Sequence, residues 1–203
     1  MKSASIPESA LTDLNGSLHG RCITPSSPDC ESARSVWNAS INKRPALIVR
    51  CMGVADVIRS VRFARAHKLL VAVRGGGHNV AGSATCDDGM VIDLGEMNAV
   101  HTNISGQSVR VEGGATIRDV DRETQMFGLA VPLGIVSETG IGGLTLCGGH
   151  SWLTRLHGFA CDNLLSVDLV LANGDLVTAS KSENSDLFWA LQGGGGNFGI
   201  AVS

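Results

Sequence analysis

The sequence predicts an α+β protein of two lobes, in which a small parallel β-α-β lobe precedes a lobe with an antiparallel sheet and flanking helices. The first lobe is indicated by two apolar runs, 46–50 and 69–73, on either side of apolar residues at helical spacing over 54–66. A helix between two apolar strands is typical of a parallel unit. The second lobe is indicated by Asn173-Gly174 between two further apolar runs, because this dipeptide is the strongest short signal for a hairpin.

The other elements follow from the same patterns. Gly128 is expected at the end of a helix, because glycine readily adopts the left-handed conformation found there. Residues 199–203 have the composition of the first part of a strand, and we expect the chain to be a fragment of a longer enzyme. We expect further strands at 90–94, 108–112, 129–131, 166–171 and 176–179, and helices at 117–127 and 187–191.

The composition changes near Pro45 and suggests where the domain begins. Residues 1–33 are rich in Ser, Pro and Asp and contain only a weak helical stretch at 9–18, so we expect an N-terminal extension there. One domain is expected over 34–203, with its first lobe at about 34–103 and its second at about 104–203.

The charge and the cysteines exclude several kinds of protein. A net charge of −3 is too small to favour binding of nucleic acid or of a membrane surface, and no apolar run is long enough to span a bilayer. The six cysteines lack Cys-x-x-Cys and zinc-site spacing, and His150 and His157 have no third ligand, so no metal is expected. Mostly free thiols and no signal peptide favour a cytoplasmic location, with a Cys22–Cys30 disulfide as the alternative.

Glycine is the unusual feature of the composition, with 26 residues concentrated in a few clusters. Glycine permits positive φ and lets a ligand approach the backbone closely. The first cluster follows an apolar run directly and is flanked by Arg74, Asn79 and Ser83. A positive charge, short polar side chains and free N–H groups suit a diphosphate. The alternative is that the glycines only form tight turns. Three glycine clusters, each beside an apolar strand, argue against this alternative.

A second glycine pattern matches a dinucleotide-binding motif but lacks the sequence context that this motif requires. Residues 194–199 satisfy Gly-x-Gly-x-x-Gly, but a dinucleotide site of that kind needs a helix directly afterwards and an acidic residue about 20 positions on. The residues alone therefore support a phosphorylated ligand and no more. His78 directly follows three glycines, and its imidazole could act as a nucleophile when it is unprotonated. The more ordinary interpretation is a hydrogen-bonding loop histidine.

Several motifs in this order and spacing resemble a known family. They are Arg74-Gly75-Gly76-Gly77-His78-Asn79, Gly142-Gly143-Leu144-Thr145-Leu146, Asp162-Asn163-Leu164-Leu165 and 193–199. From about Trp37 onward the chain resembles the FAD-binding, PCMH-type domain of the vanillyl-alcohol oxidase superfamily. The closest likeness is to its berberine-bridge-enzyme-like branch, which includes 6-hydroxy-D-nicotine oxidase-like members. The resemblance implies a two-lobed domain with FAD between the lobes.

The resemblance also implies residue roles. In such proteins the histidine of the first motif is joined to the flavin, so His78 is the candidate for a covalent link. The residues implied in FAD binding are Arg74, Gly75, Gly76, Gly77, His78, Asn79, Gly82 and Ser83 near the pyrophosphate; Thr139, Gly140, Gly142, Gly143 and Gly149 along the flavin; and Asn163, Ile200 and Val202 on the adenosine side.

Two departures and one absence limit what the resemblance implies. Val136 stands where doubly linked members have a cysteine, and Cys147 replaces a glycine. The chain has no tyrosine, which is often the family's catalytic base, so no catalytic residue is assigned. We expect the FAD-binding part of an oxidoreductase that oxidises a small alcohol, amine or sugar, with the substrate bound by an absent C-terminal domain. The alternatives are a non-catalytic or truncated flavin-binding module, an NAD enzyme and a purely structural domain.

Overall fold

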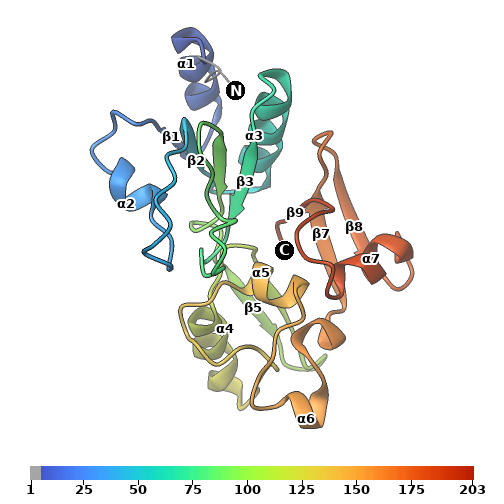
Figure 1. Ribbon diagram of the computed structural model, residues 1–203. Coiled ribbons are helices and arrows are strands. Elements are labelled where there is room, and N and C mark those ends of the chain that lie inside the picture. Colours follow the sequence, from blue (N-terminus) through green and yellow to red (C-terminus); the bar gives the residue numbers. More distant parts are fainter. Residues whose placement is uncertain (1–5) are drawn as a thin grey trace.

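The computed structural model describes residues 6–203. Its first lobe is built on a sheet of four strands, which lies in the upper part of Figure 1. The strand order is β1-β2-β4-β3. Strands β2 and β3 are both parallel to β4, which lies between them, while β1 pairs antiparallel with β2 at the edge. The strands are β1 (Arg21–Ile23), β2 (Leu47–Arg50), β3 (Val71–Arg74) and β4 (Met90–Asp93).

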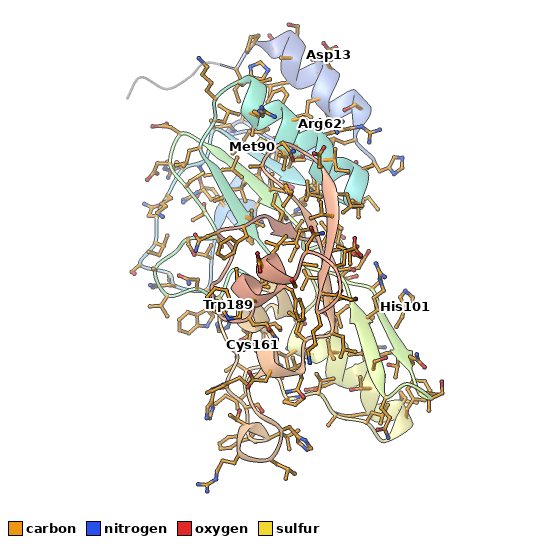
Figure 2. The ribbon with its side chains drawn as sticks, turned by 90° about the vertical axis from the view of Figure 1, so that its right-hand side faces the viewer. Asp13, Arg62, Met90, His101, Cys161 and Trp189 are labelled. Carbon is orange, nitrogen blue, oxygen red and sulfur yellow. The ribbon has the colours of Figure 1, made fainter. Side chains whose placement is uncertain are left out.

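Helix α3 (Val54–Ala66) connects β2 to β3 and coincides with the predicted helix. Its apolar stripe, which includes Val57 and Val61, is buried against the sheet in the same cluster as Leu47 and Ile92. The predicted parallel unit is therefore confirmed, although a third strand separates its two strands. Figure 2 shows Met90 in the sheet and Arg62 on α3 above it.

Residues 6–33 contribute more regular structure than the sequence indicated, and the first five residues of the expected N-terminal extension lie outside the described residues. The weak helical stretch is α1 (Glu8–Ser17), and α2 (Cys30–Arg34) and the edge strand β1 follow it. Asp56 near the start of α3 accepts hydrogen bonds from the backbone N–H groups of His19 and Gly20 at 2.9 Å each and of Met52 at 3.0 Å. The segment that follows α1 is thus fixed to α3.

Antiparallel pairing is confirmed at the predicted hairpin around Asn173-Gly174, and the structure adds a hairpin over 100–111 whose first strand was not predicted. Strands β5 (Val100–Asn103) and β6 (Ser108–Val111) form one hairpin, and β7 (Ser166–Val170), β8 (Leu176–Ser180) and β9 (Ile200–Ala201) form a sheet with β7 in the middle. Gly174 lies in the predicted turn with φ +86°. The helices are α4 (Ile117–Thr124), α5 (Ile141–Leu146), α6 (Thr154–His157) and α7 (Ser185–Leu191).

The strand predicted at 129–131 is wrong, because the structure has no strand there. The helix before it ends as expected, since α4 passes into a 3-10 turn (Gln125–Phe127) that Gly128 ends at φ +66°. The apolar residues that follow pack against the α4 cluster, but no neighbouring strand pairs with their backbone. An apolar run forms a strand only when the fold supplies a partner.

The two lobes share a continuous core. Val170, Ile200 and Val202 of the second lobe belong to the same buried cluster as Leu47 and Ile92 of the first. All six cysteines are free thiols, so Cys22 and Cys30 are not joined. Within residues 6–203 no helix is both long and apolar enough to cross a membrane, and no group of three or more His, Cys, Asp or Glu side chains could hold a metal ion.

Candidate functional site

A cavity of about 370 Å³ lies where the lobes meet, and five segments of the chain form its wall. Its size is within the usual range of small-molecule sites, about 300–1,000 Å³. The segments are the loop after β3, the residue after β4, the residues after β6, the stretch around α5, and the glycine-rich approach to β9. The lining residues are Val73, 75–79, Ser83, Ala84, Leu94, Gly113, Thr139, Gly140, 142–144, Leu146, Cys147, Gly196 and 199–201.

Most of the predicted site residues line this cavity. They come from three places far apart in the sequence, which the fold brings to one wall. The predicted residues found there are Gly75, Gly76, Gly77, His78, Asn79, Ser83, Thr139, Gly140, Gly142, Gly143 and Ile200.

Several of these glycines are required by contact between the lobes. A Cβ atom on Gly140 would lie 2.2 Å from the backbone nitrogen of Gly76, and one on Gly76 would lie 2.4 Å from the nitrogen of Gly140. A Cβ on Gly75 would lie 2.9 Å from the carbonyl oxygen of Gly113. Only glycine lets the two lobes approach this closely. The glycines therefore join the lobes as well as forming the cavity wall.

Other glycines leave the wall bare. A Cβ atom on Gly143 or on Gly196 would have no atom within 4 Å, so both positions face open space. Gly77 has φ +66°, which a side chain rarely permits, and it places the next residue, His78, at the cavity. The Nε2 atom of His78 is buried and has no hydrogen-bond partner among residues 6–203. A buried polar atom without a partner is uncommon and points to a ligand at this position.

Arg74 does not line the cavity, contrary to the expectation that its charge faces a phosphate. Its side chain is buried, and Nη2 donates to Oδ2 of Asp93 at 2.5 Å. Nη1 donates to the carbonyl oxygens of Ala33 and, at 3.2 Å, of Ser35. Since a buried cation must be paired, this guanidinium holds the structure together and leaves the cavity wall to uncharged groups.

Four further predicted residues lie outside the cavity wall. Gly82, with φ +68°, packs against Ile41, and Gly149, with φ +77°, packs against Ala160. Asn163 donates from Nδ2 to the carbonyl oxygens of His157 at 2.9 Å and of Phe159 at 2.8 Å, which shapes a surface loop. Val202 is buried in the shared core, where its carbonyl oxygen accepts from the Gly113 N–H at 3.0 Å.

Several lining residues were not among the predicted site residues. Gly113 could have been predicted, because a glycine pair directly after an apolar strand is the signal that identified the other clusters. Leu94 and Ala201 carry no such signal, since ordinary apolar residues become lining residues only through the fold. Cys147 also lines the cavity, and its thiol is free and exposed.

Comparison with known proteins identifies the ligand. The family model described as FAD binding domain matches residues 45–180. The chain belongs to this FAD-binding family. The bare glycine wall suits a diphosphate and a flat ring, and the unpartnered Nε2 of His78 gives the cavity one free nitrogen, so the residues present fit FAD. The predicted cofactor and the predicted fold are both confirmed.

Characterised relatives place this FAD-binding domain among FAD-linked oxidoreductases. The chain is 41% identical over 186 residues to (R)-6-hydroxynicotine oxidase of Paenarthrobacter nicotinovorans, covering 92% of this chain and 41% of that protein. It is 42% identical over 202 residues to the FAD-linked oxidoreductase pgmH of Aspergillus terreus, covering 98% of this chain and 41% of that protein. The chain thus spans about two fifths of the length of these relatives.

Solved structures agree with the sequence comparison. The 6-hydroxy-D-nicotine oxidase of Arthrobacter nicotinovorans matches with a TM-score of 0.90 and 40% identity, over 92% of this chain and 41% of that one. Xylooligosaccharide oxidase of Myceliophthora thermophila matches with a TM-score of 0.86 and 31% identity, over 95% of this chain and 41% of that one. The resemblance to the berberine-bridge-enzyme-like branch is confirmed, since a Physcomitrella patens member matches at 0.87 and 27% identity, over 95% of this chain and 42% of that one.

Proposed function

We propose that this domain holds FAD for an oxidoreductase that oxidises a small alcohol, amine or sugar, and that His78 is joined covalently to the flavin. The observation that carries the proposal is the buried, unpartnered Nε2 of His78 at the wall of a glycine-lined cavity. The relatives favour this substrate class, because they include oxidases of 6-hydroxynicotine and of oligosaccharides.

Different residues of the cavity wall are suited to different parts of the cofactor. FAD supplies the redox chemistry, because its isoalloxazine ring accepts a hydride from the substrate. The loop 75–79 and Ser83 provide backbone and side-chain donors suited to the pyrophosphate, as does a nest of amides elsewhere. Gly140, Gly142 and Gly143 offer a flat wall for a ring.

His78 contributes a nucleophilic nitrogen. An attachment at His78 would replace the imidazole N–H bond and one C–H bond of the flavin 8α-methyl group by a C–N bond. The two protons and two electrons released would be taken up by dioxygen as hydrogen peroxide. An imidazole reacts in this way only when it is neutral. Covalent attachment retains the cofactor and usually makes it a stronger oxidant.

We also propose that substrate binding and the catalytic base belong to a C-terminal domain that is not part of this chain. The relatives support this proposal, since the chain corresponds to 41% of their length. The chain contains no tyrosine, and we assign no base within it. A non-catalytic flavin-binding module is the second candidate; turnover by a longer form of the protein would exclude it.

The experiment combines the visible spectrum of the purified protein with acid precipitation. Flavin absorbance that remains in the wild-type pellet and passes to the supernatant in His78→Ala supports attachment at His78. A yellow protein whose flavin is released by acid would contradict the attachment but not FAD binding. A colourless protein that takes up no added FAD would contradict both.

A further inference from the structure

The His78 ring is held by Trp37, a residue from outside the cavity wall. The indole and imidazole rings are stacked, with centroids 4.8 Å apart and an interplanar angle of 22°. The backbone N–H of Trp37 also donates to the carbonyl oxygen of Gly77 at 3.1 Å. Trp37 therefore fixes both the imidazole ring and the peptide directly before it.

The residues after Trp37 continue along the same loop. Asn38 donates from Nδ2 to the carbonyl oxygen of Val80 at 2.8 Å. Lys43 donates from Nζ to the carbonyl oxygens of Gly82 at 3.0 Å and Thr85 at 3.3 Å. We call residues 36–43 the brace, because they bond to the His78 loop from 77 to 85 at successive points.

Arg74 connects the brace to the strand that carries the loop. Its guanidinium bonds to Asp93 at the end of β4 and to the carbonyl oxygens of Ala33 and Ser35, just before Trp37. One buried side chain thus fixes both the strand end before the loop and the segment directly before the brace.

The loop needs such support because its backbone is intrinsically free. Three consecutive glycines precede His78, and glycine has the widest range of backbone conformations. A reacting group displaced by about 1 Å can lose on the order of 100-fold in rate. The stack restricts the imidazole plane and leaves Nε2 without a protein partner.

We propose that Trp37 is a positioning residue for flavin attachment: it holds the His78 imidazole in the orientation from which its free nitrogen reacts. This inference rests on the attachment at His78 proposed above. Trp37 is 60% exposed, so its removal leaves little unfilled space in the core, and its variants are expected to fold.

The test uses apoprotein, prepared without flavin, and compares Trp37→Leu, Trp37→Phe and the control Trp189→Leu. Trp189 lies on α7 (Figure 2), is 78% exposed and does not line the cavity. The NMR chemical shifts of the His78 ring protons report the stack directly, because these protons lie over the face of the indole ring. They are expected to move in Trp37→Leu and to stay unchanged in Trp189→Leu.

The second readout is the rate at which added FAD becomes acid-stable. We expect Trp37→Leu to be slower by about tenfold, the order of magnitude of one aromatic stack, with Trp37→Phe near wild type and Trp189→Leu unchanged. Equal rates in Trp37→Leu and wild type would overturn the inference while leaving the attachment intact. Wild-type protein that never acquires acid-stable flavin would overturn the attachment and the inference together.

Discussion

The guanidinium of Arg74 and the imidazole of His78 lie at the two ends of a run of three glycines, and they serve different parts of the site. Arg74 is buried and paired with Asp93, whose Oδ2 also accepts a hydrogen bond from Arg50 Nε at 3.4 Å. His78 faces the cavity with a free nitrogen. In the sequence, Arg74 beside a glycine loop suggested that its charge binds a phosphate. In the structure Arg74 is buried, and its charge is paired with the carboxylate of Asp93.

Replacing Asp93 by Asn tests the role of this pair. Because the change leaves a buried guanidinium without its counter-charge, we expect the free energy of unfolding to fall by about 3 kcal/mol. The matched control is Glu138→Gln, which breaks the exposed pair with Arg118 and is expected to cost at most about 1 kcal/mol. Urea denaturation measures both. Equal costs would contradict a structural role for the buried pair.

Asp56 is a residue whose charge stabilises the fold in a pH-dependent way. Burial raises the pKa of its carboxyl, but the backbone N–H groups of Met52, His19 and Gly20 outweigh burial and hold the pKa below its ordinary value. A carboxyl with a lowered pKa in the folded state stabilises it above the ordinary pKa, near 4, and this contribution is lost as the pH falls through the folded-state pKa.

We therefore expect Asp56→Ala to lower the free energy of unfolding at pH 7 by about 3 kcal/mol, because three N–H donors lose their acceptor. The difference from wild type is expected to shrink as the pH falls below about 4. Urea denaturation across the pH range measures it. A difference that stays constant down to pH 2 would show that the carboxylate charge is not the cause.

At the scale of elements, glycine has two different roles in helix α5 and at the residue directly before it. Gly140 touches the backbone of the β3 loop, whereas Gly143 faces open space within the helix. The same substitution at these two positions therefore distinguishes contact between the lobes from space for the cofactor.

We expect Gly140→Ala to destabilise the protein, because its Cβ would lie 2.2 Å from the nitrogen of Gly76 and backbone must move. Gly143→Ala is expected to keep or slightly raise stability, by up to about 1 kcal/mol, since alanine favours a helix. Its methyl group would nevertheless enter the cavity and weaken FAD binding. Thermal denaturation of apoprotein and FAD titration measure the two effects. A destabilised Gly143→Ala, or one that binds FAD as wild type does, would contradict this division.

At the scale of the whole molecule, the cavity lies beside a core that both lobes share, since Leu94 and Ile200 belong to both. Val170, Ile200 and Val202 bury their side chains with Leu47 and Ile92, although the two groups are at least 78 positions apart in the sequence. Within the second lobe, Arg110 Nη2 on β6 donates to Asp168 Oδ2 on β7 at 2.6 Å and links its two antiparallel units. The relative position of the lobes, and with it the shape of the site, is thus fixed by this core as well as by the glycine contacts at the cavity wall.

Elements with strong local patterns could be predicted from the sequence. Helix α3 has apolar residues at regular spacing and no proline, and the β7–β8 hairpin has Asn173-Gly174 at its turn. Strands β1 and β5 were missed because they are short and carry polar or charged residues. Their pairing comes from neighbours brought there by the rest of the chain, which local patterns do not record.

The site divides in the same way. Glycine loops beside apolar strands are visible in a sequence, so the loop around His78 and the stretch before α5 could be predicted. Trp37 could not, because its stack on His78 joins segments 41 positions apart and depends on their packing. Leu94 and Ala201 were missed for the same reason.

Peptide mapping of the purified protein tests the central claim most directly. Trypsin cleaves after Arg74 and Arg110 and releases residues 75–110, which contain His78 together with His101 and Cys86 as internal comparisons. We expect this peptide to carry the mass and fluorescence of a flavin, with fragmentation placing it on His78. Flavin found on His101 or Cys86, or a wild-type peptide without flavin, would contradict the account.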